Sequence, residues 1–298
     1  MNRGVAFGVG AYLVWGVLPV FWKLLDSVAA IEILAHRFVW SIVFLSGIIV
    51  LRRRWTLISH LPRAVLLRLW FAGLLLTVNW GTYIWAVNSG HIVEASLGYF
   101  INPLINVLLG VVILRERLEP GQWAAVAIAA VGVTYMTVQV GSLPWIALVL
   151  AGTFGFYALL KKTSNVVGPI ESLAVEVSVV LIPAVGFLVA RTMAGSGAFV
   201  AGGPGTTSLL VLTGVATAVP LMLFGAAAHR VKLSTVGILQ YIAPSLQFLL
   251  GVFIYNEEVT GHELVGFTLV WIALAVFTTN TVFRSRQARL AEPAVAEL

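Results

Sequence analysis

The chain contains no cysteine and very few charged residues. Of its 298 residues 10% are charged and 60% are hydrophobic, and the mean hydropathy is +0.99. Soluble domains carry about 25% charged residues, so a chain of this composition would aggregate in water. The lack of cysteine excludes disulfides, thiolate nucleophiles and thiolate metal sites.

Enzyme motifs are missing as well. None of the five histidines stands at metal-ligand spacing, and the sequence contains neither HExxH nor GxSxG. We therefore expect a protein that is not an enzyme and that needs no metal and no cofactor.

What the sequence does contain is a series of apolar runs, each about 20 residues long, the length of a membrane-spanning helix. They predict an all-α polytopic membrane protein. The first run is too long, and too tightly followed by the second, to be a cleaved signal peptide. The ten expected spans are 4–25, 31–51, 66–88, 92–114, 120–140, 143–161, 170–191, 207–229, 233–255 and 261–283.

The second half of the chain repeats the first at an offset of 141 residues. LGYFINPLINVLLGVVILRE at 97–116 aligns without a gap with ILQYIAPSLQFLLGVFIYNE at 238–257, so that Pro103 falls on Pro244. Five spans per repeat is an odd number, so the second copy must be inverted in the membrane. We expect two inverted five-helix repeats, residues 1–140 and 141–298, around a central cavity, which is typical of secondary transporters.

Basic residues indicate the orientation, because cytoplasmic loops are rich in Lys and Arg. With the N-terminus inside, only Lys23 and Arg191 fall outside, and Arg37 lies within a span. The other 15 of the 18 fall inside: Arg3, Arg52, Arg53, Arg54, Arg63, Arg68, Arg115, Arg117, Lys161, Lys162, Arg230, Lys232, Arg284, Arg286 and Arg289. Both termini are thus expected in the cytoplasm, and the positive charge is assigned to topology and lipid headgroups, with no nucleic acid as partner.

Polar residues in the spans point to a site, since those that the bilayer tolerates usually face a cavity or another helix. They gather at mid-depth in spans that correspond in the two repeats. We expect the following residues to line a substrate cavity: Trp15, Asn79, Tyr83, Tyr99, Asn102, Tyr157, Tyr241 and Gln247. Alternatively, the amides bond only across helices, which is common in membranes.

Pro103 and Pro244 lie near the centres of corresponding spans. Each removes one backbone hydrogen bond, which is tolerated where protein or water satisfies the freed carbonyl. We expect them to act as hinges, although they can also serve packing alone.

Four titratable residues are candidates for a proton site or for structural ion pairs. Glu32, His36 and Arg37 open the second span, where Glu32 and His36 are four residues apart and can pair. A mutual ion pair is the favoured interpretation for these three. Glu176 has no evident partner in the sequence, so it is the better candidate for a proton site. Glu116 ends a span, and we expect it to pair with Arg115 or Arg117.

Several segments resemble the RarD branch of the EamA family in the drug/metabolite transporter superfamily. These are LAHR at 34–37, Trp40-Ser41, WAVN at 85–88, EASLGYFINPL at 94–104 and QYIAP at 240–244. The resemblance covers essentially the whole chain and implies ten helices, cytoplasmic termini and a bacterial inner-membrane exporter. Related YddG-type exporters move aromatic and other amino acids outward, and the superfamily usually builds its cavity from spans 1, 3, 4, 6, 8 and 9.

The resulting expectation is an alternating-access exporter of small metabolites, with amino acids first. Drugs or other amphipathic metabolites are the alternative substrates, and an uncoupled facilitator or channel would share the fold. Highly phosphorylated substrates are disfavoured, because Arg37 is the only basic residue in a span that could bind them and we expect it to lie shallow at the outer side. Small-molecule substrate and membrane lipid are the expected partners, and a monomer is sufficient.

Overall fold

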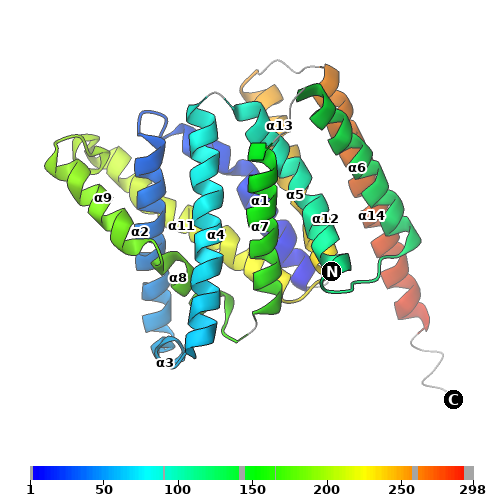
Figure 1. Ribbon diagram of the computed structural model, residues 1–298, viewed down its shortest axis with the longest axis horizontal. Helices are drawn as coiled ribbons and strands as arrows, with labels where there is room; N and C mark the ends of the chain where they lie inside the picture. The colour runs from blue at the N-terminus through cyan, green and yellow to red at the C-terminus, as the bar shows by residue number, and fades with distance from the viewer. Residues whose placement is uncertain (1–2, 90, 141–144, 165, 257–260, 292–298) are drawn as a thin grey trace.

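The computed structural model describes residues 3–89, 91–140, 145–164, 166–256 and 261–291, and these form helices and short connections with no strand among them (Figure 1). The helices are α1 (Arg3–Lys23), α2 (Ala30–Leu51), α3 (Trp55–Ser59), α4 (Arg63–Asn88), α5 (Ile92–Val112), α6 (Pro120–Val140), α7 (Trp145–Thr163), α8 (Pro169–Ser178), α9 (Leu181–Met193), α10 (Ala198–Ala201), α11 (Gly203–Ala228), α12 (Leu233–Gln240), α13 (Ile242–Ile254) and α14 (Gly261–Ala291).

The length and the apolar composition of the helices are those of a multi-pass membrane protein. Within the described ranges, eight segments are long and apolar enough to cross a bilayer, one of them formed by α12 and α13 together. Helices α8 and α9 form a ninth candidate that is bent by 56°. The apolar part of α14, Leu264–Asn280, is shorter and lies at the lower limit of a spanning length. Each of the ten expected spans overlaps a helix or a helix pair, and the apolar part of the last one is the shortest.

Two prolines coincide with interruptions of helices. A proline has no N–H for the carbonyl four residues before it, and its ring clashes with that carbonyl. The carbonyl before Pro244 belongs to Gln240, where α12 ends, and the carbonyl before Pro183 belongs to Val179, just after α8. By contrast, α5 continues through Pro103 without a break.

Glycines allow backbones of the two halves to touch. A Cβ atom at Gly73 of α4 would overlap the Glu176 carbonyl of α8, and one at Gly214 of α11 would overlap the Trp40 backbone of α2. Without hydrophobic drive between helices in lipid, such close packing of small residues is a main source of helix association. At both the α4–α8 and the α2–α11 crossing, a glycine therefore allows the two helices to pack closely.

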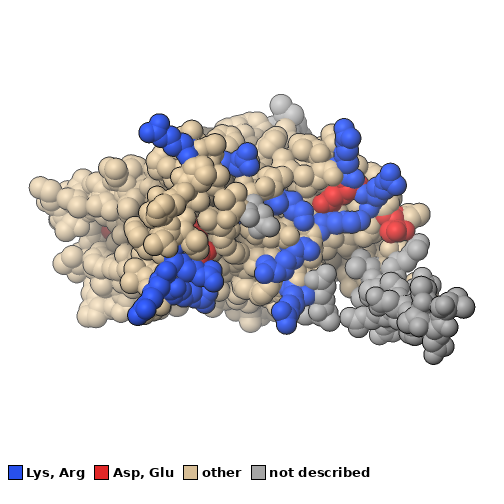
Figure 2. Space-filling view, turned by 90° about the horizontal axis from the view of Figure 1, so that it is seen from below, with Lys and Arg blue, Asp and Glu red and all other residues tan. Residues whose placement is uncertain are grey.

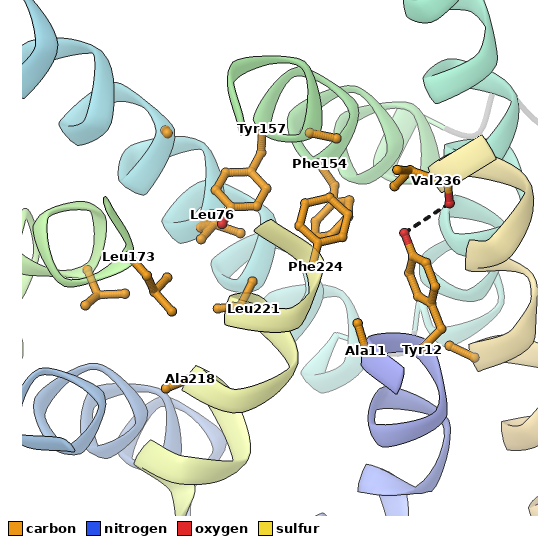
Figure 3. Packing of buried hydrophobic residues seen from close by; sticks show 14 of the residues in the cluster. Ala11, Tyr12, Leu76, Phe154, Tyr157, Leu173, Ala218, Leu221, Phe224 and Val236 are labelled. Carbon is orange, nitrogen blue, oxygen red and sulfur yellow. Dashed lines mark hydrogen bonds between the residues drawn. The ribbon is translucent and has the colours of Figure 1, made fainter. Parts of the chain in front are cut away.

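Aromatic rings pack together in the largest buried cluster, at the place where α1, α7 and α11 meet (Figure 3). Tyr157 stacks on Phe224 with ring centroids 5.9 Å apart, and Phe154 lies 5.4 Å from the same phenylalanine. Tyr12 packs against the other side of Phe224 and donates a hydrogen bond to the Val236 carbonyl at 3.2 Å. These contacts hold α1 and α7, two of the helices that line the cavity described below, against α11.

Basic side chains gather on one face of the bundle. Figure 2 views the molecule from the end where α3 lies in Figure 1, and it shows several groups of Lys and Arg on that face with only a few Asp and Glu. This face is called the basic face below.

Candidate functional site

A cavity of about 340 Å³ opens among seven helices of the bundle. Its size is in the range of small-molecule sites, which are roughly 300–1,000 Å³. It is lined by Tyr12, Trp15, Leu18, Pro19, Trp22, Arg37, Asn79, Trp80, Tyr83, Ile84, Gly98, Tyr99, Asn102, Leu150, Phe154, Gln240, Ala243, Pro244 and Gln247. Aromatic rings and amides dominate the wall.

The cavity lies toward the end of the bundle that is remote from the basic face. Its α4 residues, Asn79–Ile84, come near the end of a helix that starts beside α3. Its α1 residues run from Tyr12 to Trp22 and so occupy the second half of that helix. The cavity therefore extends from the middle of the bundle away from the basic residues.

Aromatic side chains shape the wall in pairs. Trp15 of α1 meets Phe154 of α7 edge-on at 6.0 Å, and Tyr83 of α4 meets Tyr99 of α5 edge-on at 5.8 Å. Tyr83 and Tyr99 are 38% and 37% exposed, respectively. Because both line the cavity, their rings present apolar faces and phenol oxygens to any occupant.

Amide side chains in the wall also hold the helices together. The Asn79 amide nitrogen donates to the Leu150 carbonyl at 2.7 Å and to the Thr153 hydroxyl at 2.9 Å. The Gln247 amide donates to the Trp15 carbonyl at 3.2 Å. These amides both line the cavity and bond across helices.

A chain of amides connects α5 to α12. The Asn106 amide nitrogen donates to Asn102 Oδ1 at 3.2 Å and to Gln240 Oε1 at 3.0 Å. Gln240 lines the cavity and was not among the expected site residues. Its position four residues before Pro244, where the helix is interrupted, is the signal that sequence reasoning could have used.

The structure brings together six of the eight residues that we expected to line the cavity, namely Trp15, Asn79, Tyr83, Tyr99, Asn102 and Gln247, and it adds Pro244 and Arg37. Tyr157 and Tyr241 are fully buried away from the lining. The Tyr241 hydroxyl donates to the Phe100 carbonyl at 3.2 Å. Pro103 is also absent from the lining.

Glu176 has a partner that the sequence did not reveal. Its carboxylate accepts from Lys161 Nζ at 2.8 Å and from the Tyr157 hydroxyl at 3.1 Å, and Lys161 also donates to Ser172 Oγ at 2.6 Å. Glu176 and Lys161 are both buried. The cluster joins α7 to α8, and the role of Glu176 as a proton site stays a prediction.

At the start of α2, Glu32 forms an ion pair, but not the expected one with residues of its own helix. Glu32 instead pairs with Arg191 at 3.2 Å and accepts the Ala198 N–H at 2.6 Å. His36 stacks on Phe199 with centroids 5.1 Å apart, and its ring nitrogens have no hydrogen-bond partner among the described groups. The spacing of residues along the sequence could not show that the α9–α10 region supplies the partners of Glu32 and His36.

The end of the bundle at the basic face is closed by contacts between the halves. The Glu116 carboxylate, just beyond α5, accepts the Leu233 and Ser234 N–H groups at the start of α12, at 2.6 and 3.0 Å. Lys232 Nζ donates to the Arg117 carbonyl at 2.7 Å. Glu116 therefore caps a helix of the other half, where we expected a pair with Arg115 or Arg117.

No group of three or more His, Cys, Asp or Glu side chains that could hold a metal ion occurs in the part of the chain that the structure describes. The geometry is instead that of a binding cavity with amide, phenol and guanidinium groups and aromatic walls.

Comparison with known proteins identifies the family of the chain. Residues 2–138 match the EamA-like transporter family. The chain is 46% identical to the protein RarD of Streptomyces exfoliatus, over 97% of this chain and 92% of that protein. It is 41% identical to YojE of Bacillus subtilis, described as an uncharacterized transporter, over 94% and 95% of the two chains.

One solved crystal structure, described without a function, has the same fold with a TM-score of 0.71 at 20% identity. The match covers 92% of this chain and 97% of that one. At this identity the likeness concerns the fold alone.

Proposed function

Because the chain belongs to the RarD branch of the EamA family of transporters, we propose that it exports small metabolites by alternating access, with amino acids as the first candidates. The observation that carries the proposal is the cavity, whose wall combines aromatic rings with amide and guanidinium groups. Aromatic rings suit an apolar side chain, and the polar groups suit a carboxylate and an ammonium group.

We propose further that the fold is two inverted five-helix repeats, residues 1–140 and 141–298. The packing supports this, because a contact between a helix of the first half and one of the second has a counterpart in which the equivalent helices of the opposite halves meet. Thus α4 packs on α8 as α11 packs on α2, and α7 packs on α5 as α13 packs on α1. Helices α6 and α14, the last of each half, pack on one another. Inverted repeats with a site between them are the common plan of secondary transporters.

The orientation proposed is the one with both termini in the cytoplasm of a bacterium and the basic face inside. The cavity then lies toward the outer side, and the Glu116 and Lys232 contacts close the cytoplasmic side. This arrangement corresponds to an outward-facing state. The interruption at Tyr241, before Pro244, and the bend between α8 and α9 are the positions where rocking of helices would take place.

Counterflow in proteoliposomes tests the proposal. The vesicles are preloaded with unlabelled amino acids, and uptake of labelled phenylalanine, threonine and methionine is followed, with protein-free vesicles as control. Uptake that depends on the preload is the expected result. No exchange of any of the three by folded, monodisperse protein would contradict the amino-acid assignment and favour drugs or other amphipathic metabolites.

A second measurement separates a coupled exporter from a facilitator. A proton gradient is imposed on vesicles that contain equal substrate on both sides. Accumulation above equilibrium is expected for a coupled transporter. Equilibration alone would identify an uncoupled facilitator with the same cavity.

A further inference from the structure

The cavity contains one charged side chain among the lining residues that the structure describes. That residue is Arg37 of α2, and none of the described lining residues is acidic. The remaining polar side-chain groups of the wall are neutral amides, phenols and indoles. An occupant of the cavity therefore meets a single fixed positive charge.

The guanidinium of Arg37 is held by three other helices. Its Nε–H donates to the Thr217 hydroxyl of α11 at 3.0 Å. Its carbon lies 4.1 Å from the ring centroid of Trp80 and 4.9 Å from that of Trp22. Hydrogen bonding and cation–π contact thus fix the plane of the guanidinium before any ligand binds.

The terminal nitrogens of Arg37 have no hydrogen-bond acceptor among the described groups. The one acidic residue of α2, Glu32, is engaged by Arg191 and by the Ala198 N–H. A guanidinium carries five N–H donors, and four of them are on the terminal nitrogens. A charge inside a membrane protein is costly unless it is paired or hydrated, and such residues usually mark a substrate pathway.

The two terminal nitrogens of the Arg37 guanidinium, here called its free fork, match one class of ligand. Guanidinium groups bind carboxylates through two parallel N–H···O bonds. Beside the fork, the Tyr83 and Tyr99 rings offer a place for an apolar body. No described lining group offers a negative charge for an ammonium group, which would meet only dipoles and ring faces.

We propose that Arg37 is the carboxylate-binding residue of the cavity and that the substrates are small organic carboxylates with an apolar body. The amino group of an amino acid is then dispensable for binding, and its carboxylate is not. Cationic amphipathic drugs are poor ligands, because they would face the positive charge. This inference rests on the proposed function in taking the cavity to be the substrate site.

Ligand-dependent thermal stability of the purified protein in detergent tests this inference without transport. The three probes are phenylalanine, its methyl ester, which lacks the carboxylate, and 3-phenylpropionate, which lacks the ammonium group. We expect the two carboxylates to raise Tm in a saturable manner and the ester to do so at least about tenfold less tightly, as expected when a charged partner is lost. Equal binding of acid and ester by the unaltered protein would overturn the proposal.

Arg37→Gln supplies the matched comparison, and Lys23→Gln is its control. Lys23 lies outside the cavity lining and contacts the Tyr255 ring. Arg37→Gln is expected to abolish the preference for acid over ester, whereas Lys23→Gln retains it. An undiminished preference in Arg37→Gln would overturn the proposal.

If Arg37→Gln does not fold, Arg37→Lys replaces it. Lysine keeps the charge but lacks the planar fork, so the preference is expected to fall without vanishing. An unchanged preference would again contradict the role of Arg37. If the carboxylates bind but none is exchanged in counterflow, the proposed amino-acid transport fails while the role of Arg37 stands.

Discussion

Two hydrogen bonds join the Glu116 carboxylate to Ser234, at 3.0 Å from its backbone N–H and 2.7 Å from its hydroxyl. Glu116 follows α5 in the first half of the chain, and Ser234 lies in the first turn of α12 in the second. A carboxylate at a helix N-terminus satisfies free N–H groups and the helix dipole. In the proposed alternating access, this contact separates when the cavity opens at the basic face.

Glu116→Ala is therefore expected to favour opening at the basic face. Loss of a helix cap costs about 1 kcal/mol, which corresponds to a roughly fivefold change in population. The chain has no native cysteine, so a single cysteine in place of the buried Val236 reports opening by its rate of maleimide labelling. Labelling is expected to accelerate about fivefold.

Ser59→Ala is the control for this experiment. Ser59 lies exposed at the end of α3 and bonds only within its own segment. An equal labelling rate in the Glu116→Ala and Ser59→Ala proteins would show that the cap does not hold the closed end.

The Lys161–Glu176 pair is expected to stabilise the fold. Removing one partner leaves a buried charge and typically costs about 3–5 kcal/mol, so Lys161→Met and Glu176→Leu should each lower the Tm strongly. The double variant should recover much of the loss, because both charges are then gone. Thermal unfolding in detergent measures all three.

The proton-site alternative for Glu176 makes a different prediction. It requires Glu176→Gln to abolish any dependence of transport on a proton gradient. We expect the dependence to persist, because the carboxylate is held by Lys161, Tyr157 and the surrounding core. Its loss in a folded variant would identify Glu176 as the coupling residue.

Glycine contacts between the halves provide another prediction. A methyl group at Gly73 or Gly214 would meet backbone of the facing helix, whereas one at Gly47 of α2 meets nothing within 4 Å. Overpacking typically costs about 1–3 kcal/mol. Gly73→Ala and Gly214→Ala should each lower the Tm, and Gly47→Ala should not. Equal Tm values in the three variants would contradict the close approach of the helices.

Orientation can be tested with two more single cysteines. Thr56 of α3 and Asp26 between α1 and α2 are both exposed. In right-side-out vesicles an impermeant maleimide is expected to label Asp26→Cys at once and Thr56→Cys only after permeabilisation. The reverse pattern would place the basic face outside.

Apolar runs and the repeat predicted where the helices lie, because a span needs about 20 apolar residues whatever its neighbours are. They did not predict the bend between α8 and α9, although Pro183 accounts for it. Nor did they predict that α5 continues through Pro103 while its counterpart is interrupted before Pro244. The effect of a proline depends on which groups take up the freed carbonyl, and tertiary packing decides that.

The sequence predicted which types of residue line the candidate site better than it predicted their hydrogen-bond partners. Polar and aromatic residues at mid-depth gave six of the eight expected lining positions. Tyr157 and Tyr241 look the same in sequence, but their hydroxyl groups bond Glu176 and the Phe100 carbonyl inside the core. Arg37 was expected to pair within its own helix, yet its hydrogen-bond partner, Thr217, is 180 residues away. Such partners are set by helix packing.

The measurement that tests the central claim most directly is counterflow by Tyr99→Ala beside Trp123→Ala. Tyr99 lines the cavity, whereas Trp123 of α6 is 49% exposed and lies outside the lining. Loss of an aromatic contact worth roughly 1 kcal/mol or more should reduce exchange several-fold in Tyr99→Ala and leave Trp123→Ala as active as the unaltered protein. Equal exchange by all three folded proteins would contradict the assignment of this cavity as the path of the substrate.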